Sequence, residues 1–593
     1  MSRIKSQISY YDLTGGLNNV NTQDTINSSP KKTESPDMIN VEFFKLGGIK
    51  SMEGNVQFGD TQSSSIVGGW EYTKNNNKYM IIALKTGELK IYNPVTEEFD
   101  EIYKFQSQAN RVSFCNMNNG IVATNGIDDP VFYEKGRHQL LAGAISTTAN
   151  STAITGNGTQ FTVELKPGDR IQIDDSNTDY IIDVITDDTN LTLTSEFPET
   201  LSDVNYYLSE ISPCNAQLIN TDPEVVPTPA PIPIRGTAIQ FFAGRLWIGG
   251  EKGLFYSQIG QYNKWDEYYD AGVIPEVYND TSEVRALGLY SNYMLVHKEF
   301  NTYLLIMTSD SSSMSIQPYS NVSCDSQQSW IVSNTKYYVY SAENMDIYPL
   351  SQRTIYSDRY LGEAITNKVR NVFQNLRDAD LKNIFCVSLP RKRWMIFYMP
   401  MVEQVGSGYA LIYDFQVKAF VPRRIPQDVT IAFNYMNEVY VGTSDGLVLK
   451  EFTGRDFNGE TLVSYFKSPW YDWAGDYYHS FAEFAIDMAS EYNNNFYIRT
   501  FKDGDSPYED RIIDDGAIQT TGLIWDGDTH IETNNTKWDD DTWVSGNFNS
   551  IRMLLPNNVF ETFQVEIGTN TLGQAFAIYG YNFRRLETEE APW

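Results

Sequence analysis

The chain has 593 residues and a formal net charge of −31 at pH 7. This charge argues against a surface that grips nucleic-acid phosphates, because such binding depends on clustered Lys and Arg. Aromatic residues make up 14% of the chain, and 40 Gly with 23 Pro supply turns. The composition therefore favours an all-β fold. The length exceeds one ordinary core but fits a β-propeller with attached domains.

The four cysteines are scattered without a CxxC pair, and none of the four histidines lies beside one of them. We therefore expect no zinc site, no disulfide framework and no cofactor, and a reducing site of synthesis. The first residues lack an apolar signal segment, and no run of about 18 apolar residues occurs. The sequence thus predicts no membrane span and synthesis in a cytoplasm.

Residues 1–60 are predicted to form an extended arm followed by a hairpin. Residues 17–37 are polar and contain too few apolar side chains to build a core, so we expect them to lie along the body or a neighbouring subunit. Residues 38–44 supply a strand, and Gly47-Gly48 predicts a turn into the next strand.

Two stretches, 61–139 and 212–460, are predicted to form the propeller. In the first, four short strands between 64 and 105 are separated by polar turns and fit one blade of roughly 40–50 residues. In the second, a strand, a polar turn and an aromatic strand recur without strict sequence identity, at 237–260, 282–305 and 330–350. The Pro-rich stretch 225–236 predicts an extended connector.

The interruption, residues 140–211, has its own turn pattern and alternates apolar with polar residues. This predicts a small inserted β-barrel of five or six strands that resembles SH3- or OB-like modules. An OB fold can bind single strands or sugars, but 156–200 contains one Lys and one Arg. We therefore do not expect this barrel to bind nucleic acid.

One helix is predicted, near residues 362–375, where apolar residues fall at helical spacing. Residues 391–393 and 423–424 are tight basic clusters, and we expect them to form salt bridges across an acidic protein or at an interface. Residues 461–593 contain long alternating strands, which predict a C-terminal β-sandwich-like domain.

Two acidic turns, WDGDT and WDDDT, lie in the C-terminal region. Hard cations such as Ca²⁺ favour clustered carboxylate oxygens, but neither turn has the full calcium-loop pattern. We therefore predict a pair of Trp-anchored turns and no metal, and leave cation binding open for Asp526, Asp528, Asp539 and Asp541.

No nucleophile elbow, phosphate-binding loop or HExxH motif occurs, so the sequence does not predict an enzyme. Propeller glycosidases place two carboxylates on the central axis. No local signature distinguishes such a pair here from surface charge.

An ordered set of short motifs resembles the tail nozzle family of short-tailed bacteriophages, also called tail tubular protein B or head-to-tail stabilisation proteins. The resemblance covers nearly the whole chain except 140–211. The chain departs from the family at Lys50, where Arg is usual, and at Phe420, where Trp is common. The residues that carry the motifs are Gly15, Gly16, Leu17, Asn18, Asn40, Val41, Gly48, Lys50, Gly54, Tyr413 and Asp414.

The resemblance implies a structural virion protein of a podovirus-like tail, made in the host bacterial cytoplasm. It implies a homohexameric ring below the portal and adaptor proteins that docks tail fibres or spikes. Double-stranded DNA would be retained by this tail tube and ejected through it, without specific binding. Two alternatives stay open, namely a virion-associated glycan hydrolase and a carbohydrate- or fibre-binding adhesin on a propeller.

Overall fold

Strands form most of the regular structure, as the alternating sequence predicts. The computed structural model describes residues 5–590 except 21–27, 30–31, 45–46, 138, 166, 175–177, 226, 278, 308–313, 335, 342–343, 351–363, 377–380, 382, 403–405, 473–476, 481–482, 490–494, 505–508, 514–547 and 555–559. The acidic turns with Asp526, Asp528, Asp539 and Asp541 lie outside the described residues. No helix within the described part of the chain is long and apolar enough to cross a membrane.

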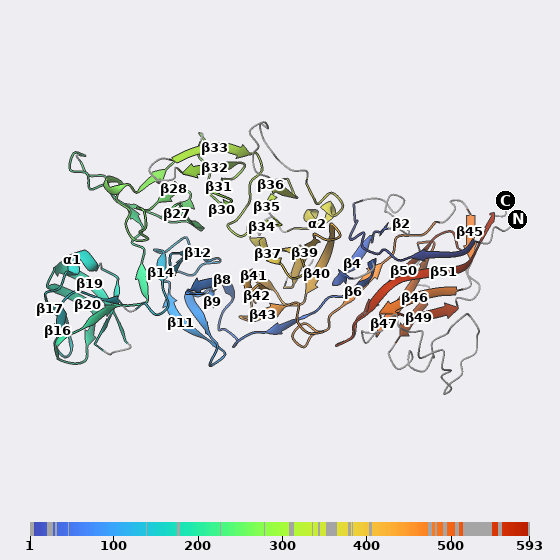
Figure 1. Ribbon diagram of the computed structural model, residues 1–593, viewed down its shortest axis with the longest axis horizontal. Helices are drawn as coiled ribbons and strands as arrows, with labels where there is room; N and C mark the ends of the chain where they lie inside the picture. The colour runs from blue at the N-terminus through green and yellow to red at the C-terminus, as the bar shows by residue number, and fades with distance from the viewer. Residues whose placement is uncertain are drawn as a thin grey trace.

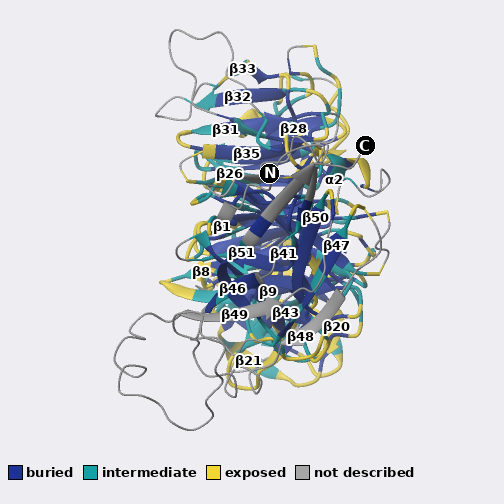
Figure 2. Cartoon of the chain, turned by 90° about the vertical axis from the view of Figure 1, so that its right-hand side faces the viewer, coloured by how far each residue is buried: buried dark blue, intermediate teal, exposed yellow. Residues whose placement is uncertain are grey.

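Three bodies follow one another along the long axis of the molecule (Figure 1). The inserted barrel lies at one end, a β-propeller occupies the middle, and a β-sandwich lies at the other end. The all-β fold with a propeller-like body is therefore confirmed. Strands at the centre are buried, while exposed residues gather in the loops (Figure 2).

Seven antiparallel sheets, here called blades 1 to 7, form the propeller in the described residues. Blades 1 to 3 consist of β8 Ile66–Lys74, β9 Asn77–Leu84, β10 Glu88–Asn93 and β11 Glu98–Lys104; β12 Ser113–Met117, β13 Gly120–Thr124, β14 Val131–Tyr133 and β23 Ile211–Pro213; and β26 Ala238–Phe242, β27 Arg245–Gly250, β28 Gly253–Tyr256 and β29 Gly272–Ile274.

Blade 5 has three described strands, and the other late blades have four. Blades 4 to 7 consist of β30 Ala286–Tyr290, β31 Tyr293–His297, β32 Thr302–Met307 and β33 Met314–Ser320; β34 Trp330–Ser333, β35 Lys336–Ser341 and β36 Asp346–Leu350; β37 Phe385–Leu389, β38 Trp394–Met399, β39 Gly408–Asp414 and β40 Ala419–Ile425; and β41 Val429–Tyr435, β42 Glu438–Thr443, β43 Val448–Glu451 and β7 Asn55–Gln57.

Local sequence explains the tight hairpins within the blades. Asn75-Asn76, Ala243-Gly244 and Met436-Asn437 each have two successive positive φ values. Two-residue turns of this kind match the twist of the strands that they connect. Neighbouring blades then pack through apolar clusters, so each blade buries both of its faces.

The first strand of each blade lies innermost, and except between blades 4 and 5 it lies next to the first strands of the neighbouring blades. Blades 4 and 5 are joined at this inner level by Gln327, whose amide accepts from Leu287 N at 2.8 Å and donates to Leu287 O at 2.9 Å. The ring is closed by β7, which comes before blade 1 in sequence but pairs with β43 of blade 7. Residues 55–57, assigned to the predicted hairpin region, thus belong to the propeller.

The inserted barrel connects β14 to β23 of blade 2. Segment 201–208 closes it, because its first half pairs with β16 and its second half with β18. Phe161 from a short helix, which the sequence did not predict, is fully buried in the barrel core. The elements are β15 Gln139–Leu140, β16 Ala144–Thr147, β17 Ser151–Asn157, α1 Phe161–Glu164, β18 Arg170–Ile173, β19 Asp179–Asp187, β20 Asn190–Phe197, β21 Leu201–Val204 and β22 Tyr206–Leu208.

The sandwich combines strands from both ends of the chain. One sheet contains β49 Phe548–Leu554, β46 Glu483–Ala489, β51 Ala577–Glu590, β6 Ile49–Ser51, β5 Val41–Phe43, β1 Lys5–Tyr10 and β45 Tyr477–Ser480. The other contains β4 Asp37–Ile39, β44 Ser464–Lys467, β50 Phe563–Thr569, β47 Phe496–Lys502 and β48 Glu509–Ile513. The rings of Phe563 and Phe583, one from each sheet, have centres 5.7 Å apart.

Short pairs complete the described elements: β2 Ser28–Ser29 with β3 Lys32–Thr33, and β24 Gln217–Leu218 with β25 Ile232–Pro233. A 3₁₀ turn spans η3 Glu267–Tyr269.

The predicted helix near 362–375 is much shorter in the structure, where α2 spans Arg370–Gln374. Its expected first part instead lies beside blade 5. Ile365 N donates to Ile347 O at 3.1 Å, so this backbone follows the edge of β36 and is not helical. Residues 362 and 363 lie outside the described part.

The barrel has its own apolar core, and its two ends meet at blade 2. Arg137 Nε donates to Ser209 O at 2.8 Å, so a short link can join them. We expect replacement of residues 139–208 by a Gly-Ser bridge to lower the thermal midpoint by no more than about 5 °C. Calorimetry of the shortened chain tests this, and loss of cooperative unfolding would show that the barrel is needed for the propeller core.

Candidate functional sites: the N-terminal junction and the axial cavity

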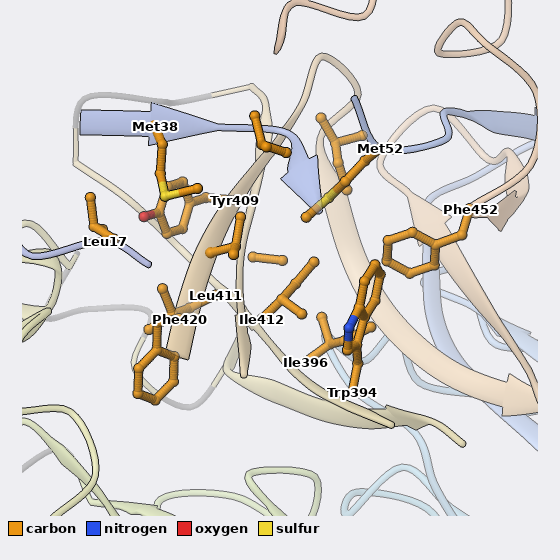
Figure 3. Packing of buried hydrophobic residues seen from close by; sticks show 14 of the residues in the cluster. Leu17, Met38, Met52, Trp394, Ile396, Tyr409, Leu411, Ile412, Phe420 and Phe452 are labelled. Atoms are coloured by element: carbon orange, nitrogen blue, oxygen red, sulfur yellow. The ribbon is translucent and has the colours of Figure 1, made fainter. Parts of the chain in front are cut away.

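Most of the motif residues predicted from sequence meet at one place, here called the N-terminal junction. It is formed by residues 12–20, 32–44 and 47–55 where they pass between blades 6 and 7 and the sandwich. Leu17 N donates to Phe420 O at 2.9 Å, and Asn40 N donates to Pro422 O at 3.0 Å. Figure 3 shows Leu17, Met38 and Met52 of this segment around the apolar side chains of blade 6. The described residues of the arm therefore lie along the body of their own chain.

The Gly15-Gly16-Leu17-Asn18 motif permits a close backbone approach. A Cβ on Gly15 would lie 2.3 Å from Thr33 O, and one on Gly16, which has φ +77°, would lie 2.6 Å from Ala419 Cβ. Only glycine fits these two positions without movement of the neighbouring chain. Asn18 Nδ2 donates to Glu34 at 2.6 Å, and Lys368 beside α2 pairs with the same carboxylate.

Asn40 joins blade 6 to the sandwich. Its φ of 52° lies in the left-handed region, which Asn tolerates better than most residues. Its Nδ2 donates to Arg424 O at 3.1 Å and to Val463 O at 2.7 Å, and its Oδ1 accepts from Arg424 N at 2.9 Å. The next residue, Val41, is fully buried. Both members of this motif thus have structural roles.

Lys50 belongs to an ion-pair network on β5 and β6. Its Nζ lies 2.9 Å from Glu42, and Lys392 reaches Glu42 at 2.6 Å and Glu53 at 3.0 Å. Glu42 is 5% exposed at its side chain, so the two lysines balance a nearly buried charge. Gly48 allows the strand to approach β51, because a Cβ there would lie 2.5 Å from Ile578 O.

A fully buried ion pair lies where Gly54 meets blades 6 and 7. Arg423 Nε of β40 lies 2.7 Å from Glu451 Oε2 of β43, and both side chains are 0% exposed. The remaining Arg423 nitrogens donate to Glu53 O at 2.8 Å and Gly54 O at 3.0 Å. Asn55 Nδ2 donates to the other carboxylate oxygen at 2.9 Å.

The bend at Gly54 is tightly enclosed. A Cβ at this position would lie 1.7 Å from Asp456 O. The Arg423 guanidinium also lies over the rings of Phe452 and Phe457, at 4.5 and 5.0 Å from their centres. The approach of the N-terminal segment to the ion pair therefore requires glycine at residue 54.

Tyr413 and Asp414 stabilise the hairpin between β39 and β40. The Asp414 carboxylate accepts from Trp394 Nε1 at 3.0 Å and from Gln416 N at 2.7 Å. Burial raises the pKa of Asp414, and these hydrogen bonds oppose that rise. Tyr413 packs on Phe420, with ring centres 4.8 Å apart. This motif therefore shapes the strand whose carbonyl groups bind the N-terminal segment.

The basic clusters form salt bridges, as expected from sequence. Arg391 pairs with Glu438 at 3.1 Å, Lys392 with Glu42, and Arg423 with Glu451. Sequence reasoning did not identify Glu451 as the buried partner. The signal was weak: Glu451 follows Lys450 in β43, and only its alternation with Leu449 places it on a buried face, where a charge requires a counter-charge.

A second candidate site is the axial cavity, of about 630 Å³, at the end of the propeller where the inner strands begin. Its lining includes residues that precede the first strand in every blade. Sequence reasoning missed it because these side chains come from separate points over more than 350 residues. They include Ser65, Arg111, Thr237, Glu283, Asp325, Asn383 and Asp428.

Charges of both signs line this cavity. Arg285 binds Asp325 at 3.2 Å and Glu299 at 2.7 Å, which fixes one carboxylate. Arg111 of blade 2 donates from Nη2 to Asn383 Oδ1 of blade 6 at 3.2 Å. Its guanidinium carbon lies 4.9 Å from the centre of the Phe385 ring. Arg111 therefore extends from blade 2 to residues of blade 6.

The described residues offer little nucleophilic or metal-binding chemistry. Burial raises the pKa of all four cysteine thiols, so they resist ionisation at neutral pH. No group of three or more His, Cys, Asp or Glu side chains in the described part of the chain is placed to hold a metal ion.

No protein-family model and no curated protein matches the chain. Among solved structures, the computationally designed Ika8 protein is similar at 12% identity and a TM-score of 0.33, over 68% of this chain and 100% of that chain. BamB from Moraxella catarrhalis is similar at 11% identity and a TM-score of 0.31, over 76% of this chain and 97% of that chain. U3-55K is similar at 7% identity and a TM-score of 0.35, over 68% of this chain and 99% of that chain. Likenesses at this level carry no argument about function.

The buried pair gives a direct test of the junction. In Arg423→Met, Glu451 stays buried without its counter-charge, so we expect a loss of about 3–5 kcal/mol of stability. The matched control is Lys104→Met, whose partner is Glu88 and whose side chain is 56% exposed. That change should cost much less stability, because an exposed ion pair is screened by solvent. Urea unfolding measures both, and equal losses would contradict the role given to the buried pair.

Proposed function

We propose that this chain is a structural protein of a short-tailed phage tail, which forms a homohexameric nozzle below the portal and adaptor rings. The observation that carries the proposal is the convergence of the motif residues. Most of the residues that resemble the family, taken from 15–54 and 413–414, contact one another or shared neighbours at the N-terminal junction. Several of these positions have a structural reason for their residue type, among them the glycines at close backbone approaches and Asn40 at positive φ, as a shared architecture requires.

The shape and chemistry of the chain support a mechanical role. The barrel and the sandwich lie at opposite ends of the propeller (Figure 1), so each end offers a separate surface to a different partner. The adaptor and a tail fibre or spike are the partners that we propose. Closed rings of identical subunits need no catalytic group to hold DNA and release it. The net charge of −31 disfavours tight binding of passing DNA.

The axial cavity favours one alternative, a glycan-binding or glycan-hydrolysing propeller. Glu283, Asp325 and Asp428 place carboxylates at its lining, and paired carboxylates perform glycoside hydrolysis. Arg285 holds Asp325 in an ion pair, so this carboxylate is not poised as a general acid.

Native mass spectrometry of the purified chain, alone and with the adaptor ring of its phage, tests the proposal. We expect a closed assembly of six 67.6 kDa chains. The assembly should show no measurable binding of duplex DNA at physiological salt. A chain that stays monomeric or trimeric in both samples would contradict the nozzle assignment, and cleavage of host polysaccharide by that chain would favour the hydrolase.

A further inference from the structure

We propose that the axial cavity is a binding site for a small polyhydroxylated carboxylate, such as a uronic acid. The inference rests on the cavity and its charges alone and does not depend on the tail assignment. It goes beyond a structural role, because it proposes that the cavity on the propeller axis binds a small molecule.

The carboxylate is inferred from Arg111. Surrounding protein lowers the pKa of its guanidinium to about 10, which leaves it charged at neutral pH. No carboxylate among the described residues lies within ion-pair distance of it. The Arg111 side chain is only partly exposed where it lines the cavity, and a partly shielded charge without a counter-charge is unfavourable. The cavity therefore favours an anion beside this side chain.

The geometry of Arg111 specifies the shape of that anion. A guanidinium carries five N–H donors, and Asn383 accepts from one of them. Arg111 also lines the open volume, so donors remain available there. A planar fork of this kind binds a carboxylate through two parallel hydrogen bonds. Phe385 lies under the guanidinium and helps to hold its plane.

The remaining lining indicates hydroxyl groups on the ligand. Glu283 and Asp428 line the same cavity and repel an ion of high negative charge, but they accept hydrogen bonds from hydroxyls. Neutral hydroxyl side chains from Ser65 and Thr237 add both donors and acceptors, whereas the Thr430 hydroxyl donates to backbone carbonyl groups and adds an acceptor alone. A ligand with one carboxylate and several hydroxyls can bind both Arg111 and the acidic and hydroxyl side chains of the lining. Inorganic phosphate can bind Arg111 but is repelled by the carboxylates.

The size of the cavity agrees with a sugar acid. At about 630 Å³ it falls within the range of roughly 300–1,000 Å³ that ligand sites occupy in proteins. A monosaccharide or disaccharide fits this volume. All seven blades supply lining residues, so the site requires the closed propeller.

Isothermal titration calorimetry of the full chain with glucuronate, glucose and inorganic phosphate tests the proposal. We expect glucuronate to bind, with glucose and phosphate each about tenfold weaker or more. Arg111→Gln should weaken glucuronate binding about tenfold or more, and Arg111→Lys should fall between, because it keeps the charge but loses the fork. Lys104→Gln, on the outer strand of blade 1, is the matched control and should bind as the unchanged chain does.

Three results would overturn the proposal. They are no glucuronate binding, equal glucuronate affinity in Arg111→Gln, and phosphate binding as tight as that of glucuronate, which would show a simple anion site. Circular dichroism and the thermal midpoint establish that each variant is folded. If Arg111→Gln does not fold, the affinity of Arg111→Lys decides, since a value equal to that of the unchanged chain would contradict bidentate recognition.

Discussion

The structure depends on the buried ion pair between Arg423 and Glu451. Removing two charges from water costs several kcal/mol per ion, so such a pair persists only where hydrogen bonds satisfy its remaining groups. Here Glu53 O, Gly54 O and Asn55 Nδ2 do so, and all three belong to the N-terminal segment. Burial of the ion pair therefore requires the N-terminal segment, which supplies these hydrogen bonds. In turn, the pair holds the start of β7, the strand that closes the propeller.

The same segment makes the propeller and the sandwich interdependent. After leaving the sandwich it crosses blade 6 and then completes blade 7, so its strands pair with partners about 390 to 530 residues away. Apolar residues of blades 5 to 7 and of both sandwich sheets belong to one continuous cluster. The inserted barrel has a separate core. We infer that propeller and sandwich form one cooperative unit, with slow folding because of the long-range pairing.

Local patterns predicted those parts of the fold that depend on neighbouring residues. Alternation and Asn- or Gly-containing turns indicated the blades, and a change in turn pattern indicated the barrel. Pairing between distant segments was not predictable in this way. Strand β7 was assigned to a hairpin because no local pattern shows that residues 55–57 pair with β43. The predicted helix near 362–375 was too long. The backbone at Ile365 hydrogen-bonds to blade 5 instead of forming a helix, despite the helical spacing of its apolar residues.

The candidate sites follow the same division. Gly16 and Asn40 were singled out as motif residues, and both occupy positions of positive φ, which restricts the residue type. Arg111 could not be singled out from the sequence, because its role depends on contacts with Asn383 and Phe385, which lie more than 270 residues away. Propeller axes gather one short segment from each blade, so their chemistry becomes visible only when the ring is closed.

Hydrogen exchange followed by mass spectrometry tests the central claim, that the N-terminal segment holds propeller and sandwich in one cooperative unit. The account predicts that amides in 38–57 exchange as slowly as those of β40 and β50, and that all three become exposed together as urea is added. Exchange of 38–57 at low urea, while β40 and β50 stay protected, would contradict it. That result would show that the segment is an appendage to two independently stable domains.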